Sequence, residues 1–151
     1  MTQEIICFVA VTVVGLMAGI MLGVALTQQT AQRLSAECWT ARQSCSDRLF
    51  RKIMPSTFIL ILLASLSAIV VLYHAAKLWM GMSLVASLLV IVITMALEVP
   101  LNNKFARWEP EKIPDDWQLL RDAWLRNHWL RTYFGIAAFL LTLVACSIYK
   151  A

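Results

Sequence analysis

Long apolar runs alternate with two polar segments along this chain of 151 residues. The apolar runs occupy residues 5–26, 57–76, 78–99 and, more briefly, 133–149. Each approaches the ~20 residues that an α-helix needs to cross a hydrocarbon core of ~30 Å. The pattern therefore predicts an all-α protein, a four-helix transmembrane bundle that forms a single membrane domain over residues 1–151.

The composition indicates that these helices lie in lipid. Hydrophobic residues make up 60% of the chain, charged residues make up 15%, and the mean hydropathy is +0.72. Soluble domains are roughly half apolar and roughly a quarter charged. The net charge is +4, but the basic residues cluster between the apolar runs, which is typical of membrane topology rather than of nucleic-acid binding. We therefore expect a lipid bilayer as the surroundings and no nucleic-acid partner.

The basic residues also predict the orientation in the membrane. Of the 13 Lys and Arg residues, all but Lys77 and Lys150 fall in two polar segments, residues 27–56 and 100–132. The positive-inside rule places such segments in the cytoplasm. The sequence thus predicts a protein integral to the plasma (inner) membrane, with cytoplasmic polar segments between spans one and two and between spans three and four. Both termini are then outside.

Prolines and caps predict where the helices begin and end. Much of the first polar segment is expected to be helical, with Pro55 in the first turn of the second span. Pro100 is expected to end or kink the third span and to bias Val99 away from the helical conformation. Asp115, with Gln118 three residues later, predicts the start of a helix that continues into the fourth span.

Three glycines in the first span, Gly15, Gly19 and Gly23, recur every four residues and share one face. Small residues at this spacing allow membrane helices to approach closely. We favour close helix packing over the alternative, in which the glycines make room for a ligand.

The spacing of Trp124, His128 and Arg131 places all three on one stripe of a helix. Trp117 falls on the same stripe upstream, and Gly135 leaves a gap in it downstream. An aromatic wall, a titratable ring and a fixed cation on one face predict a pocket. The alternatives are a positive-inside anchor for Arg131 and a place in the interfacial aromatic belt for Trp117.

Two polar residues near the end of the third span could belong to the same pocket. Glu98 is an acid within an apolar run, and a carboxylate at membrane depth by default indicates function together with a partner. Its position near the cytoplasmic end leaves a simple interfacial charge equally open. Asn102, two residues after Pro100, either satisfies backbone groups that the proline frees or points into the pocket.

Cofactor sites have little support in the sequence. His74 and His128 would be the ligands of a bis-histidine haem, but the expected topology puts them near opposite faces of the membrane. Cys38 and Cys45 are seven residues apart, without the spacing of a zinc site. The sequence therefore predicts no metal site and no cofactor, although haem held by a single histidine, or a bound quinone, stays open.

Three short motifs resemble the anthrone-oxygenase-like family of small four-span membrane proteins. They are P-L-N after the third span, a W-x-P turn followed by D-W, and W-x-x-x-H-x-x-R entering the fourth span. The resemblance implies the four-span fold and, for some members, oxidation of anthrones to anthraquinones by molecular oxygen. Many members have no assigned activity. The site residues that it implies are Asn102, Trp124, His128 and Arg131.

The chemistry of such an oxidation can be assigned to these residues. An anthrone carbanion reacts with oxygen without a metal, so the enzyme needs a base and groups that stabilise an oxyanion. His128 is the candidate base, with Arg131 and Asn102 as oxyanion donors. The candidate substrate-binding residues for a flat aromatic molecule arriving from the bilayer are Trp124, Trp117 and Glu98. Two other classes stay open: a non-catalytic membrane subunit that docks a partner or a second copy, and a quinone- or haem-binding protein.

Overall fold

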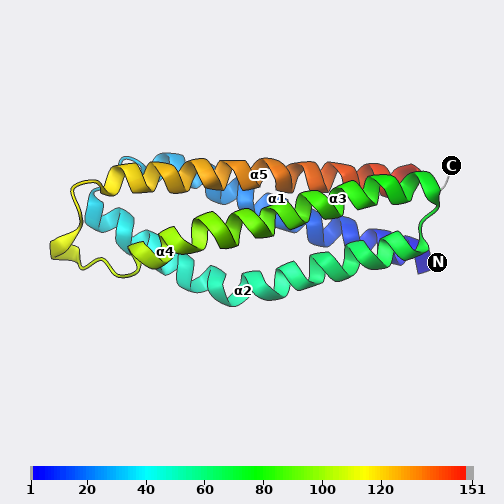
Figure 1. The fold of residues 1–151 in the computed structure, drawn as a ribbon, viewed down its shortest axis with the longest axis horizontal. Coiled ribbons are helices and arrows are strands. Elements are labelled where there is room, and N and C mark those ends of the chain that lie inside the picture. The colour runs from blue at the N-terminus through cyan, green and yellow to red at the C-terminus, as the bar shows by residue number, and fades with distance from the viewer. Residues whose placement is uncertain (1, 149–151) are drawn as a thin grey trace.

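The computed structural model describes residues 2–148 and is helical almost throughout. Its elements, in chain order, are α1 (Thr2–Ala31), α2 (Ala36–Val71), α3 (His74–Ile93), the π-helical turn η1 (Thr94–Glu98), α4 (Val99–Phe105), the 3-10 turn η2 (Pro110–Lys112) and α5 (Trp117–Ile148). The long helices lie side by side, and the start of α1 and the end of α5 lie at the same end of the molecule (Figure 1).

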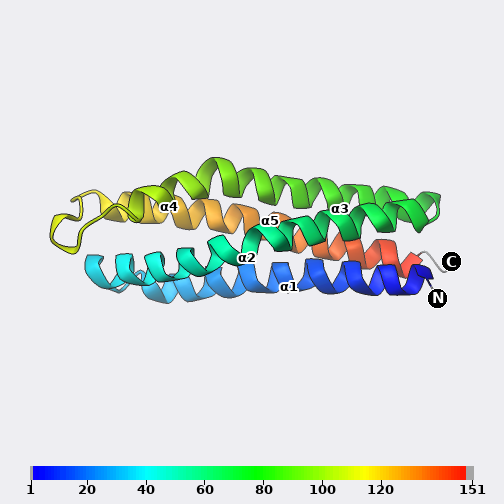
Figure 2. The ribbon, with the colours of Figure 1, turned by 90° about the horizontal axis from the view of Figure 1, so that it is seen from below.

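Four helical segments within residues 2–148 are long and apolar enough to cross a membrane. This confirms the all-helical, four-span prediction. The helices have 30 to 36 residues, and a helix of about 30 residues is ~45 Å long, whereas the hydrocarbon core is ~30 Å thick. The polar residues therefore lie on helical extensions at the end of the molecule opposite the termini, where α4 and the start of α2 are seen (Figure 2). Ser35 caps α2 there by accepting from the Cys38 amide at 3.4 Å.

Pro55 lies inside α2 and not in the first turn of a new helix, so that prediction is wrong. Proline has no N–H, so α2 cannot make the usual bond to the carbonyl of Arg51. The helix changes direction near its middle (Figure 1), as expected for an internal proline. The polar stretch before Pro55 and the apolar stretch after it thus form one bent helix.

Pro100 does not turn the chain out of the helix. Val99 has helical angles (φ −58°, ψ −43°), which contradicts the prediction that it leaves the helical conformation. The π turn η1 directly precedes Pro100, and the helix continues through α4 to Phe105. The wider π turn shifts the hydrogen-bond register, so the missing N–H and the ring of Pro100 fall in the first turn of α4.

The last helix begins at Trp117, two residues later than Asp115. It then runs without interruption through Trp124, His128 and Arg131 to Ile148, which confirms that this stripe and the fourth span share one helix. The predicted end of the span at Tyr149 lies outside the described residues.

The glycines of α1 pack less than expected. A Cβ on Gly15 would come within 2.8 Å of the Phe139 ring on α5, but Gly19 and Gly23 are exposed and have nothing within 4 Å of such a Cβ. The packing prediction is therefore wrong for these two. Helices α1 and α5 also approach closely at Gly135, where a Cβ would overlap Cε of Met21.

Candidate functional site

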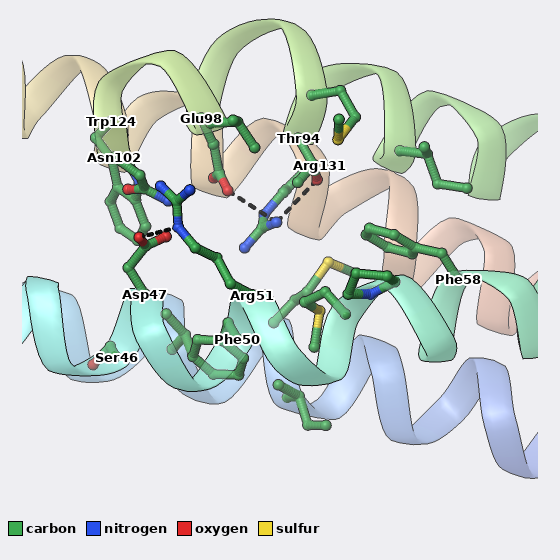
Figure 3. Close-up of a pocket in the computed structure, with 18 of the residues that line it drawn as sticks. Ser46, Asp47, Phe50, Arg51, Phe58, Thr94, Glu98, Asn102, Trp124 and Arg131 are labelled. Carbon is green, nitrogen blue, oxygen red and sulfur yellow. Dashed lines mark hydrogen bonds and ion pairs between the residues drawn. The ribbon is translucent and has the colours of Figure 1, made fainter. Parts of the chain in front are cut away.

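A cavity of about 500 Å³ lies between α1, α2, the η1–α4 segment and α5 (Figure 3). Its volume is within the ~300–1,000 Å³ typical of ligand pockets. Most of its wall is apolar. Its polar lining residues are Gln28, Gln43, Ser46, Asp47, Arg51, Thr94, Glu98, Asn102, Trp124 and Arg131.

The cavity lies beside the bend of α2 and opens toward the flank of the helices. Pro55 lines it, so α2 changes direction beside the cavity. Ile20, Ile59 and Met95 also line it, and these side chains are 41%, 58% and 60% exposed. They come from three helices that can span a membrane. The cavity therefore has an apolar mouth on the flank of the helices, the surface that lipid covers when they span a membrane.

Three charged or titratable side chains meet at one wall of the cavity. Glu98 Oε2 lies 2.9 Å from Arg131 Nη1, and Glu98 Oε1 lies 3.1 Å from His128 Nδ1. His128 is fully buried, Glu98 is 2% exposed, and the Arg131 side chain is 11% exposed. Glu98 and Arg131 line the cavity, whereas His128 lies behind them. We call these three residues the His–Glu–Arg centre.

The hydrogen-bond partners of His128 indicate its tautomer. Nε2 lies 3.0 Å from the backbone carbonyl of Met21, and because a carbonyl only accepts, Nε2 carries a proton. In the neutral ring Nδ1 is therefore bare, and it accepts from Arg131 Nη2 at 3.0 Å and Nε at 3.3 Å. In the imidazolium, Nδ1 donates to Glu98 instead. The ring has partners in both states, so it can take up a proton without losing its position.

Thr94 holds the guanidinium in place. Its hydroxyl accepts from Arg131 Nη1 at 3.0 Å and donates to the Val90 carbonyl at 2.7 Å. Both Thr94 and Glu98 belong to η1, and both point toward Arg131 (Figure 3). The π turn thus presents a hydroxyl and a carboxylate to one cation, in keeping with the frequent use of such turns at functional sites.

The two tryptophans proposed as substrate-binding residues have different surroundings. Trp124 lines the cavity and stacks on His128, with ring centroids 4.8 Å apart and planes 15° from parallel. Trp117 does not contribute to the cavity lining. It packs 6.0 Å from Trp39 and under the guanidinium of Arg121 at 5.0 Å, within an aromatic cluster at the polar end of the molecule.

Asn102 lines the cavity, but its hydrogen bond is with Gln43 and not with His128 or Arg131. Its Oδ1 accepts from Gln43 Nε2 at 3.1 Å, and Gln43 Oε1 accepts from Gln28 Nε2 at 2.8 Å. These three side chains form an amide ladder across α4, α2 and α1. Asn102 therefore shares the cavity with the His–Glu–Arg centre while belonging to a separate hydrogen-bond chain.

Several lining residues were missed by the sequence analysis. Thr94 could have been found, because it lies four residues before Glu98 on the same helix face. Asp47 and Arg51 are paired at 2.5 Å, and Arg51 also donates to Asn103 at 2.6 Å. Nothing in the sequence singles out the amide ladder. Across the described residues, no three His, Cys, Asp or Glu side chains are grouped so as to hold a metal ion.

The fold and site define a class of protein: a small helical membrane protein whose apolar cavity is bounded by a buried histidine, carboxylate and guanidinium. A family model described as anthrone oxygenase matches residues 44–141. The chain belongs to this family, which confirms the resemblance of the motifs. The match contains the whole His–Glu–Arg centre but not α1. No curated protein and no solved structure matches the chain.

Proposed function

We propose that this protein is a cofactor-independent oxygenase that oxidises a flat, anthrone-like aromatic inside the cavity. The observation that carries the proposal is the His–Glu–Arg centre, a proton acceptor and a cation placed together on the wall of an apolar cavity. Family membership supports the reaction class. The exposed apolar mouth on the helix flank supports access for a substrate dissolved in the bilayer.

The first step is removal of a proton from the carbon between the two aromatic rings. Glu98 lines the cavity and accepts this proton, which then moves from Oε1 to His128 Nδ1 across 3.1 Å. His128 is thus the base that stores the proton, reached through Glu98. The electron pair left on carbon delocalises onto the carbonyl oxygen of the substrate and forms an oxyanion.

Proton storage on His128 also changes what Arg131 can bind. Once Nδ1 is protonated it no longer accepts, so Nη2 and Nε of Arg131 lose an acceptor at 3.0 and 3.3 Å. These donors are then free for the oxyanion, a stabilisation that arises only after proton transfer. Asn102, which also lines the cavity, contributes a side-chain amide.

Oxygen completes the reaction. The carbanion gives its electrons to O₂, a carbon–oxygen bond forms, and the stored proton returns to make a hydroperoxide. Loss of the second hydrogen from the same carbon breaks the O–O bond and releases water, leaving the quinone carbonyl. One O₂ is consumed and one water is released, so the substrate itself supplies the electrons.

The orientation proposed for the protein is the one that the basic residues predict. The protein lies in the plasma (inner) membrane with both termini outside and with the polar helix extensions in the cytoplasm. The His–Glu–Arg centre is then near the cytoplasmic edge of the bilayer.

Oxygen uptake by purified protein in lipid nanodiscs, with anthrone as substrate and the protein-free rate subtracted, tests the proposal. His128→Gln is expected to lower kcat at least ~100-fold, because a positioned base contributes about 10²–10⁴-fold. Arg131→Lys is also expected to lower kcat, because an ammonium cannot replace the planar fork of donors. Arg126→Lys, exposed on the same helix and outside the cavity lining, is the matched control. Unchanged oxygen uptake in His128→Gln would overturn the proposal.

A further inference from the structure

Two of the four cysteines, Cys7 on α1 and Cys146 on α5, lie together where the start of α1 meets the end of α5. The Cys146 thiol donates to the backbone carbonyl of Cys7, with Sγ and O 3.9 Å apart, and it also interacts with the Cys7 side chain. Both are free thiols in this structure, Cys7 buried and Cys146 partly exposed. The two residues are 139 positions apart in the sequence, so the fold itself brings them together.

Helices α1 and α5 are as close at this level as a disulfide requires. A disulfide joins residues whose Cα atoms are roughly 4.4–6.8 Å apart. A carbonyl oxygen is about 2.4 Å from its own Cα, so the contact places Cys146 Sγ no more than about 6.3 Å from Cys7 Cα. Ala10, one turn after Cys7, and Ala145, next to Cys146, are fully buried, and such small residues let membrane helices approach closely. Rotation of the two side chains can then bring the sulfurs together.

The other two cysteines cannot form such a bond with each other. Cys38 and Cys45 both lie on α2, and their seven-residue separation is ~10 Å along the helix axis. That distance is beyond the reach of a disulfide. They are also at the polar end of the molecule, opposite the start of α1. Cys7 and Cys146 are therefore the intramolecular pair that the fold allows.

We propose that Cys7 and Cys146 form a disulfide that joins the start of α1 to the end of α5. The proposed orientation places this pair at the outer side of the membrane, because both termini are outside. Disulfides form and persist in the oxidising compartments outside the cytoplasm. The inference therefore rests on that orientation, but it does not depend on the oxygenase reaction. Both residues also lie outside residues 44–141, the part that the family model matches.

The bond forms by thiol–disulfide exchange with an external disulfide, which is the oxidant. Cys146 is the more exposed of the two, so its thiolate attacks the external disulfide first, and one external thiol leaves. Cys7 then attacks the Cys146 sulfur of the mixed disulfide, and the second external thiol leaves. The two protein thiols are oxidised to one disulfide, and the external disulfide is reduced to two thiols.

The bond closes a loop of the chain that runs through all four spans. In the chain-entropy model, a cross-link that closes a long loop stabilises a protein mainly by restricting its unfolded state. It also ties α1 covalently to α5, and α1 supplies the Met21 carbonyl that is bonded to His128. The disulfide thus holds a partner of the His–Glu–Arg centre in the bundle without contacting the cavity.

Thiol trapping tests whether the bond forms in cells. Cells that express the full-length protein are quenched with acid, the protein is alkylated with N-ethylmaleimide in SDS so that buried thiols also react, and its peptides are analysed by mass spectrometry without reductant. We expect one linked pair of peptides containing Cys7 and Cys146, two hydrogen atoms lighter than the separate thiol peptides. Cys38 and Cys45 are expected to carry the maleimide. Alkylation of both Cys7 and Cys146 would overturn the inference.

Thermal unfolding of the purified protein in nanodiscs tests whether the bond stabilises the bundle. Oxidised wild type is expected to unfold about 5–10 °C above the Cys7→Ala/Cys146→Ala variant, and dithiothreitol should remove this difference. Cys38→Ser/Cys45→Ser is the matched control and should unfold like wild type. Equal midpoints for oxidised wild type and the Cys7→Ala/Cys146→Ala variant would also overturn the inference. Neither measurement involves turnover, so the disulfide and the oxygenase proposal can fail separately.

Discussion

Glu98 and Arg131 form an ion pair whose contributions to stability are expected to be strongly coupled. Replacing one of the two residues should lower the free energy of unfolding more than replacing both. The atoms Glu98 Oε2 and Arg131 Nη1 are 2.9 Å apart and nearly shielded from solvent. At that separation and an effective dielectric constant of about 20, the attraction is about 6 kcal/mol. Removing each ion from water costs several kcal/mol, which offsets much of this gain. The intact pair therefore contributes little net stability, but a single buried charge without its partner destabilises the protein.

Replacing one partner is accordingly expected to lower the free energy of unfolding by about 3–5 kcal/mol. Glu98→Gln leaves the Arg131 guanidinium with Thr94 and His128 as its remaining partners, neither of them an anion. Arg131→Met leaves the Glu98 carboxylate beside His128. In the double variant both charges are gone, and the loss is expected to be smaller than in either single variant.

Reversible unfolding in mixed micelles, with denaturing detergent added stepwise, measures the free energy for the four proteins of this double-mutant cycle. The coupling energy should exceed about 2 kcal/mol, within the range seen for residues in direct contact. Additive losses would refute the reasoning, because they would mean that each side chain acts through separate neighbours. Stability losses below about 1 kcal/mol for both single variants, the value of an exposed pair, would refute it as well.

Three further outcomes follow from packing and exposure. Gly135→Val is expected to lower the free energy of unfolding by about 1–3 kcal/mol, because a side chain there displaces the methionine thioether from α1; an unchanged midpoint of unfolding in detergent would contradict this. Gly19→Leu is expected to change that free energy by no more than about 0.5 kcal/mol, whereas Gly15→Leu should be destabilising because it meets an aromatic ring on α5. Exposed Cys38 and Cys45 should react with a membrane-impermeant maleimide in inside-out vesicles but not in intact cells, and labelling of intact cells would reverse the orientation.

The sequence predicted contacts along one helix better than contacts between helices. His128 and Arg131 are three residues apart on α5, and helical geometry alone brings them together. Trp117 lies on the same stripe, but seven residues before Trp124 is ~10 Å along the axis. That distance takes it past the cavity into the aromatic cluster. A shared stripe therefore indicates a shared face but not a shared pocket.

Contacts between helices could not be predicted from the periodicity of the sequence, because periodicity describes the faces of one helix at a time. Glu98 was recognised as a candidate because a carboxylate in an apolar run is rare, but its partners were not predictable from position alone. Asn102 was expected beside Arg131, yet it bonds to Gln43 on another helix. The position of Pro55 and the conformation of Val99 before Pro100 were predicted wrongly. A proline can be accommodated inside a helix by a bend or a π turn, and the local sequence does not show whether the packed structure uses one.

The contact between His128 and the Met21 carbonyl has a consequence for how membrane and chemistry are connected. The acceptor is a backbone oxygen, so no substitution at position 21 deletes it, and only the height of α1 relative to α5 decides whether it is in reach. A slide of one residue along the axis moves that oxygen by ~1.5 Å and would release the imidazole to exchange its tautomer. Membrane helices respond to bilayer thickness by tilting. The thickness of the surrounding lipid is thus expected to affect which nitrogen of His128 carries the proton. If the protein is the proposed oxygenase, its turnover should differ between short-chain and long-chain bilayers.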